Sequence, residues 1–195
     1  AMMHTAEYQE TPADALRCLE GSLAVFREHR LRGNEAVCLL NMGNLVFSQR
    51  DLEAAGRCYE ESLAIFRDMG NTWGMANCLG NLGMVLYWRG EYRPAMERCA
   101  QYRDIAREIG DREGAAIALG NMGFVATRLG DLAAAARYFA EAIPYSRSIS
   151  AVPLLLDTVL GMADVRARSG DLAGGAEWLG LVLGVFAEAG VLFGK

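Results

Sequence analysis

The sequence predicts an all-α fold, with about nine helices arranged as antiparallel pairs in a solenoid. Three observations support this prediction. Similar segments recur every forty residues, apolar residues follow helical spacing, and short polar or glycine turns separate the helical stretches. The recurring segments are Asn41-Met-Gly-Asn, Asn81-Leu-Gly-Met and Asn121-Met-Gly-Phe. Because one repeat cannot bury its apolar faces alone, neighbouring repeats must stack and share a core.

Each period contains two amphipathic stretches. In the first period, Leu39 and Leu45 belong to one apolar stripe, and Tyr59 and Leu63 belong to the next. At turns such as Arg89-Gly90-Glu91, we expect glycine to end one helix in the left-handed conformation and the acid to cap the next helix. We expect Pro144 to kink its helix. The expected helix pairs span residues 34–49 with 52–69, 73–89 with 92–109, 113–129 with 132–149, and 153–168 with 172–189.

A lone helix precedes these pairs. Thr11, Pro12 and Asp14 form a helix start signal, and the helix is expected to run to about Glu28. Its Ala15, Cys18 and Phe26 align with Ala55, Cys58 and Phe66, so it corresponds to the second helix of a repeat without a first helix. We therefore expect one repeat domain over residues 1–195, forming a fragment of a larger protein. Its parts are a lone helix at 11–31 and repeats at about 34–69, 73–109, 113–149 and 153–190.

Composition argues against several classes of partner and site. The net charge is -5 and the pI about 5.1, so no basic field would attract nucleic acid or an anionic membrane. No stretch reaches the roughly twenty apolar residues of a membrane span, and no secretion signal is present, so we expect a cytoplasmic protein. Cys18, Cys38, Cys58 and Cys78 lie twenty residues apart because the repeat places them there. They form no metal-ligand motif, and we expect no metal and no cofactor.

At the positions where paired helices approach each other, the residues resemble those of the tetratricopeptide repeat. The small residues are Gly43, Gly83, Gly123 and Ala163 in the first helices and Ala55, Ala95 and Ala135 in the second helices. The family's usual tryptophan is replaced by Leu39, Leu79 and Leu119, and its terminal proline by Arg67, Arg107 and Arg147. The long period is similar to that of Pins-type adaptors, kinesin light chains, bacterial signal-transduction ATPases and maltose-regulator-type activators. The resemblance implies a right-handed solenoid that binds proteins or peptides, or that senses a ligand within a larger regulator.

In this family the first helix of each pair lines the inner face of the solenoid, so the candidate binding residues lie on the stripes that point away from the second helices. Asn41, Asn81 and Asn121 form a column whose amides would suit an extended peptide backbone, or would instead tie neighbouring helices together. The apolar side chains on these stripes would form pockets for a partner, or would instead pack between repeats. Asp157 and Asp164 make the last stripe acidic. The candidate residues are Asn41, Asn44, Trp73, Asn77, Asn81, Met84, Trp88, Ile117, Asn121, Phe124 and Arg128.

No phosphate loop, nucleophile elbow or zinc-protease motif occurs, so we expect a non-catalytic scaffold. Only Lys195 among the 19 basic residues is a lysine, and alanine and glycine are abundant, so we expect the scaffold to belong to a bacterial regulatory protein. The alternatives are a self-associating module or a ligand-sensing module of a signal-transduction ATPase or transcription regulator. The last helix is apolar around most of its circumference and would form the dimer contact. Its candidate interface residues are Trp178, Leu179, Val182 and Phe186.

Overall fold

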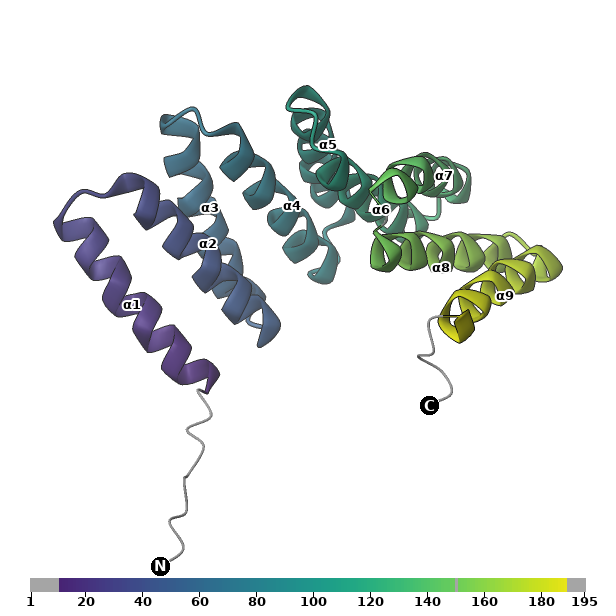
Figure 1. Ribbon diagram of the computed structural model, residues 1–195, viewed down its shortest axis with the longest axis horizontal. Coiled ribbons are helices and arrows are strands. Elements are labelled where there is room, and N and C mark those ends of the chain that lie inside the picture. Colours follow the sequence, from purple (N-terminus) through teal and green to yellow (C-terminus); the bar gives the residue numbers. More distant parts are fainter. Residues whose placement is uncertain (1–10, 150, 189–195) are drawn as a thin grey trace, which may run out of the picture. The chain divides into compact units, whose positions relative to one another are not determined.

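The computed structural model describes the backbone of residues 11–149 and 151–188 and the side chains of 11–149 and 151–180. The described residues form nine α-helices (Figure 1), and every helix begins and ends within two residues of its predicted bounds. The predicted all-α fold of antiparallel helix pairs is confirmed. The helices are α1 (Pro12–Glu28), α2 (Arg32–Ser48), α3 (Leu52–Asp68), α4 (Thr72–Trp88), α5 (Tyr92–Glu108), α6 (Arg112–Leu129), α7 (Leu132–Ser148), α8 (Val152–Arg168) and α9 (Leu172–Glu188).

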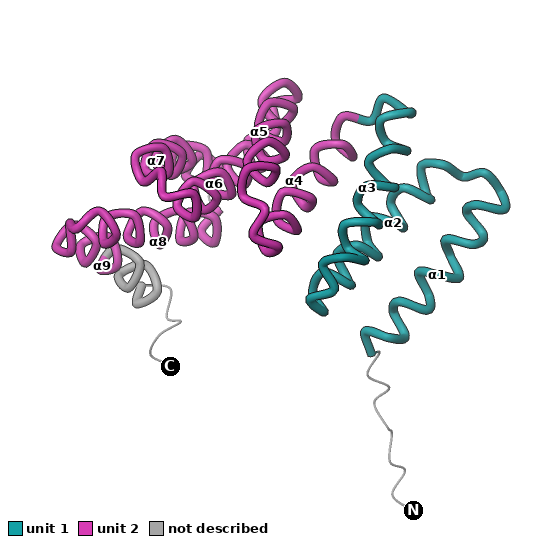
Figure 2. Tube along the Cα trace, turned by 180° about the vertical axis from the view of Figure 1, so that it is seen from behind, with its two compact units in different colours: residues 1–71 teal, residues 72–195 magenta. Residues whose placement is uncertain are grey.

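The chain divides into two compact units (Figure 2), unit 1 at residues 1–71 and unit 2 at residues 72–195. In unit 1, α2 packs against both α1 and α3. In unit 2, each helix from α4 to α9 packs against the next, and α6 also contacts α4 and α8. The first helices of the three pairs in unit 2 are therefore direct neighbours. None of the helices within the described residues is both long and apolar enough to cross a membrane.

Most helix ends follow the predicted turn chemistry. Thr11 and Asp14 form a capping box, and five glycines that end helices take φ values between 66° and 88°. Glu91 is an exception, because it makes no side-chain cap and instead pairs with Arg89 at 2.8 Å. Arg30 and Arg50 are also exceptions, because arginine replaces glycine there at positive φ. The predicted acid cap is confirmed where aspartate follows the turn, at Asp51, Asp111, Asp131 and Asp171.

Arg30 is predicted to cost stability because its φ is 55°, in the left-handed region where a side chain clashes with its own backbone. Arg30→Gly should raise the free energy of unfolding by about 1 kcal/mol, measured by urea denaturation. Arg57→Gly is the control, because Arg57 is exposed in the middle of α3, where glycine should lower stability by about 1 kcal/mol. A loss of stability in both variants would contradict the strain at Arg30.

Three of the four helix pairs, α2 with α3, α4 with α5 and α6 with α7, close on a glycine that lies against a ring or a thiol. A Cβ atom on Gly43 would lie 2.5 Å from the Tyr59 ring, and one on Gly123 would lie 2.5 Å from the Phe139 ring. On α4, a Cβ atom on Gly83 would lie 2.7 Å from the Cys99 sulfur. Only glycine fits at such distances, which is the physical reason for the small residue in each first helix.

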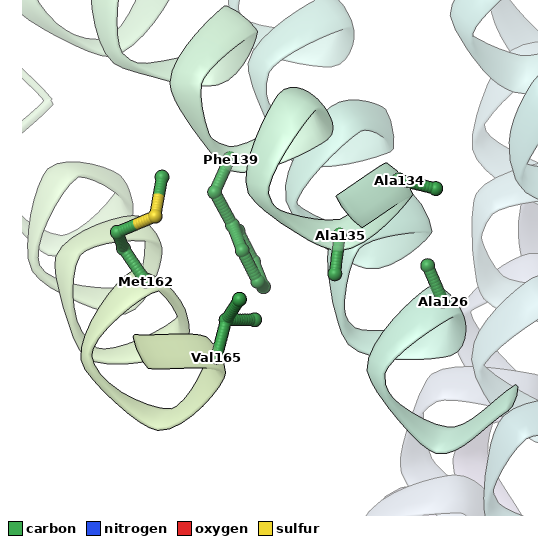
Figure 3. Packing of buried hydrophobic residues seen from close by; sticks show 6 residues of the cluster. All are labelled: Ala126, Ala134, Ala135, Phe139, Met162 and Val165. Atoms are coloured by element: carbon green, nitrogen blue, oxygen red, sulfur yellow. The ribbon is translucent and has the colours of Figure 1, made fainter. Parts of the chain in front are cut away.

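Phe139 is the centre of the core in unit 2. Its side chain is fully buried, and Figure 3 shows the ring extending from α7 toward Val165 of α8, with Met162 on the same helix. A Cβ atom on Gly161 of α8 would lie 2.3 Å from the tip of this ring. The ring tip therefore lies between glycines of two successive repeats. α7 continues through Pro144 to Ser148, so the proline does not end the helix.

The cysteines are free thiols, and Cys38, Cys78 and Cys99 are buried. The Cys38 thiol donates to the Leu19 carbonyl oxygen at 3.2 Å, which links α2 to α1. Burial raises the pKa of the Cys99 thiol to about 12. The pKa of the Tyr102 hydroxyl is also raised to about 12, mainly by burial and to a smaller extent by the nearby charge of Asp111. Among the described residues, no group of three or more histidine, cysteine or acidic side chains could hold a metal ion.

Stability is predicted to fall in alkali because these pKa values are raised by folding. Between pH 9 and 12 the unfolded chain loses the Cys99 proton, with its ordinary pKa of 9.0, while the folded chain keeps it. The free energy of unfolding should then decrease by up to about 1.4 kcal/mol per pH unit for each such group. Urea unfolding of wild type and Tyr102→Phe at pH 8 to 11 checks this, and the variant should show the shallower decline. Equal slopes would exclude a contribution from Tyr102.

Candidate protein-binding face

Unit 2 leaves one stripe on each of its first helices uncovered. Most other central positions of α4 and α6 are buried, whereas this stripe is half-buried or exposed. Since α6 contacts both α4 and α8, the three stripes form one surface, which we call the first-helix face. The first-helix face comprises Trp73, Asn77, Asn81, Met84 and Trp88 on α4, Ile117, Asn121, Phe124 and Arg128 on α6, and Asp157, Leu160, Asp164 and Arg168 on α8.

Two tryptophans on α4 expose large apolar areas. Trp73 is 58% exposed and Trp88 is 49% exposed. The Trp88 ring meets the Tyr87 ring edge to face, with centroids 5.5 Å apart, so its orientation is partly fixed. Half-exposed, oriented tryptophans are typical anchors of protein interfaces, because their burial on binding costs little conformational entropy.

The asparagines of the first-helix face differ in how their amides are used. The Asn77 amide nitrogen donates to the Trp73 carbonyl oxygen at 2.9 Å, within its own helix. Asn81 is half-buried and makes an interaction within the protein. The Asn121 side chain makes no hydrogen bond within the part of the chain that the structure describes. Asn121 is therefore the asparagine of this face whose amide is open to a partner.

The apolar side chains beside Asn121 serve both the core and the surface. Met84, Ile117 and Phe124 are half-buried. The Phe124 ring packs edge to face on Phe139 with centroids 5.1 Å apart, so part of its area belongs to the core. The remaining exposed area flanks the Asn121 amide with apolar surface, the usual composition of a site that combines burial with one polar contact.

Opposite charges lie on α6 and α8 of this face. Arg128 donates from Nε to the Tyr92 hydroxyl at 3.0 Å, a bond that raises its pKa, and it lies over the Tyr92 ring. On α8, Arg168 pairs with Asp164 at 2.9 Å, while partial burial raises the pKa of Asp157. Within the described ranges, neither Arg128 nor Asp157 forms an ion pair, so one positive and one negative group remain for a partner.

The candidate residues of unit 1, Asn41 and Asn44, differ in their surroundings. Asn41 is exposed and lines a cleft of about 370 Å³ between α1 and α2, beside Asn34 and Val37. The side-chain Oδ1 of Asn44 accepts a hydrogen bond from the Tyr59 hydroxyl at 2.9 Å. This bond joins α2 to α3, so Asn44 has a structural contact.

The candidate interface on α9 is partly described. Trp178 is half-buried and packs against the core around Phe139, whereas Leu179 is 46% exposed. The side chains of Val182 and Phe186 lie outside the described residues.

Sequence reasoning missed Leu160 and Tyr92. Leu160 is 41% exposed on the first-helix face and lies three residues after Asp157, so helical spacing was the signal that could have found it. Tyr92 holds Arg128 across 36 residues, and no local pattern indicates that contact.

The sequence and structure are similar to known repeat proteins. Residues 74–148 match the family model of the tetratricopeptide repeat. Residues 74–148 of unit 2 therefore form tetratricopeptide-type repeats. The fold is similar to a putative kinesin light chain from Podospora anserina, with a TM-score of 0.75 and 14% identity over 91% of this chain and 88% of that chain. These repeats generally act as scaffolds for protein interaction.

Two further solved structures are also similar. One is a signal transduction ATPase with a tetratricopeptide repeat sensor from Pyrococcus horikoshii, with a TM-score of 0.78 and 20% identity over 93% of this chain and 29% of that chain. The other is a Rap protein solved with Competence and Sporulation Factor, with a TM-score of 0.79 and 15% identity over 91% of this chain and 50% of that chain. The chain thus spans half or less of these two proteins. No curated protein sequence gives a significant match.

Proposed function

We propose that the protein is a non-catalytic scaffold whose unit 2 binds an extended segment of a partner protein across α4, α6 and α8. The observation that carries this proposal is the open Asn121 amide on the central helix, flanked by Ile117 and Phe124. An amide offers two donor hydrogens and an acceptor, which match the backbone of an extended segment. Burying the flanking apolar surface would supply most of the affinity, and Trp73 and Trp88 would anchor apolar side chains at the α4 edge.

The charges of the first-helix face would orient the bound segment. A carboxylate of the partner would pair with Arg128 on α6, and a basic group would pair with Asp157 on α8. The similarity to a Rap protein solved with a bound factor and to an ATPase with a repeat sensor supports a regulatory context. We place this scaffold in a cytoplasmic regulatory protein of bacterial origin.

The test is a pull-down from cell lysate with immobilised wild type and two variants. Asn121→Arg places a large charged side chain in the centre of the face, and Gln101→Arg places the same side chain at an exposed position of α5. A partner retained by wild type and Gln101→Arg but reduced about tenfold by Asn121→Arg would support the proposal. Equal retention by all three chains would exclude Asn121 from the binding site. Circular dichroism melts of all three would confirm that the fold is intact.

Self-association is the second candidate function, and exposed leucines on α9 favour it. Leu172 is 71% exposed and Leu179 is 46% exposed, and their spacing of seven residues places them on one helix face. A symmetric α9 contact would cover this stripe. Sedimentation equilibrium would then show a dimer that Leu172→Asp with Leu179→Asp converts to a monomer, whereas a monomeric wild type would exclude this function.

A further inference from the structure

A second surface of unit 2 lies away from the first-helix face. Between α7 and α8 there is a groove of about 570 Å³, which we call the α7–α8 groove. Met162 and Val165 form its floor, and both are buried members of the core around Phe139. On α8, these two residues lie on a different side of the helix from Asp157 and Asp164. The groove is therefore a separate site.

The groove exists because the third repeat carries smaller side chains than the second. The wall on α7 includes Ala133 and Ala136. One period earlier, on α5, the same two positions hold Arg93 and Met96. Met96 is half-buried against the core, so a methionine at this register fills the space between a second helix and the next first helix. At Ala136 that space is open.

The rim of the groove is basic at positions where the preceding repeat is acidic or neutral. Arg137 replaces Glu97, and Arg166 replaces Ala126. Arg137 is exposed and forms no ion pair within the described part of the chain. Arg166 pairs with Asp171 at 2.8 Å, and both groups are about half exposed, so a partner carboxylate could exchange with Asp171. The differences between the third repeat and the second thus open the groove, and together with Arg166 they make its rim positive.

We propose that the α7–α8 groove binds a short acidic amphipathic helix of a partner protein. The lining runs from Leu132 to Ala140 on α7, a length of about 12 Å, which fits roughly two turns of a helix. A volume of 570 Å³ accommodates the apolar face of such a helix and lies within the usual range of binding sites of about 300–1,000 Å³. Carboxylates beside that apolar face pair with Arg137 and Arg166.

The proposal is tested with two fluorescein-labelled synthetic peptides of about fifteen residues, near the length at which isolated helices form. Both peptides carry leucine and alanine on one face, and the flanking positions are glutamate in one and lysine in the other. Fluorescence anisotropy should show that the wild-type protein binds the glutamate peptide at least about tenfold more tightly than the lysine peptide. Comparable affinities, or no binding of the glutamate peptide, would overturn the proposal.

Three variants locate the binding. Ala136→Met and Arg137→Glu give the groove the residues of the preceding repeat, so each variant should fold. Each should lower the affinity for the glutamate peptide about tenfold. Asn121→Arg on the first-helix face should leave this affinity unchanged. Loss of affinity with Asn121→Arg, or unchanged affinity with Arg137→Glu, would overturn the proposal. Because Arg137 is on the exposed rim, Arg137→Glu tests the binding site even if Ala136→Met disturbs packing.

Discussion

Replacing Phe139 by alanine is expected to lower the free energy of unfolding by about 3–5 kcal/mol. The side chain is fully buried, and its ring connects the core of α7 to Met162 and Val165 on α8. Its removal leaves a cavity between two repeats, which glycine residues on both sides cannot fill. Because neighbouring repeats stabilise each other through such contacts, the effect should extend to the docking of α8 and α9.

Urea denaturation followed by circular dichroism measures this loss for Phe139→Ala and for Phe124→Ala. Phe124 packs on the same ring but is only half-buried, so Phe124→Ala should lower the free energy of unfolding distinctly less than Phe139→Ala. The corresponding shift in melting temperature for Phe139→Ala is roughly 6–20 °C for a chain of this size. A loss no larger than that of Phe124→Ala would show that Phe139 does not hold the repeats together.

Gly123→Ala is expected to destabilise the protein by about 1–3 kcal/mol, although alanine favours a helix over glycine by about 1 kcal/mol. The added Cβ atom would lie 2.5 Å from the Phe139 ring. The ring cannot move toward α8, because a Cβ position on Gly161 is only 2.3 Å from its tip. Overpacking therefore outweighs helix propensity at this position.

Gly120 provides a matched control three residues away on α6. A Cβ atom there meets no other atom within 4 Å, so Gly120→Ala should raise stability by up to about 1 kcal/mol. Adding Phe139→Leu to Gly123→Ala should recover part of the loss, since the shorter side chain removes the clash, and the two changes should be strongly non-additive. Equal stabilisation by the two single glycine variants would contradict the close approach of α6 and α7.

The helices were predictable because their information is local. The spacing of apolar residues and turns such as Gly130-Asp131 each constrain only a few neighbouring residues, and the forty-residue period repeats these local signals along the chain. The same local logic explains where prediction failed. Glu91 looks like a capping acid, but its longer side chain pairs with Arg89. Arg30 takes the left-handed conformation of Gly70 and Gly110, which only the alignment of the repeats indicates, because arginine itself disfavours it.

The binding residues were only partly predictable. Helical spacing placed Asn77, Asn81 and Asn121 on one face, but their hydrogen-bond partners depend on three-dimensional neighbours. Arg128 is held by a tyrosine in another helix for the same reason. The α7–α8 groove depends on the exchange of Met96 for Ala136, a difference visible in the aligned repeats whose consequence required the packing of α7 on α8.

Site-specific photo-crosslinking tests most directly whether the first-helix face binds a partner segment. A benzophenone amino acid replaces Asn121 in one chain and the exposed Gln101 in another, and each is irradiated with the partner retained in the pull-down. Our account predicts that position 121 crosslinks to one continuous segment of the partner and that position 101 does not. Crosslinking from position 101 alone, or equally from both positions, would contradict binding at the first-helix face.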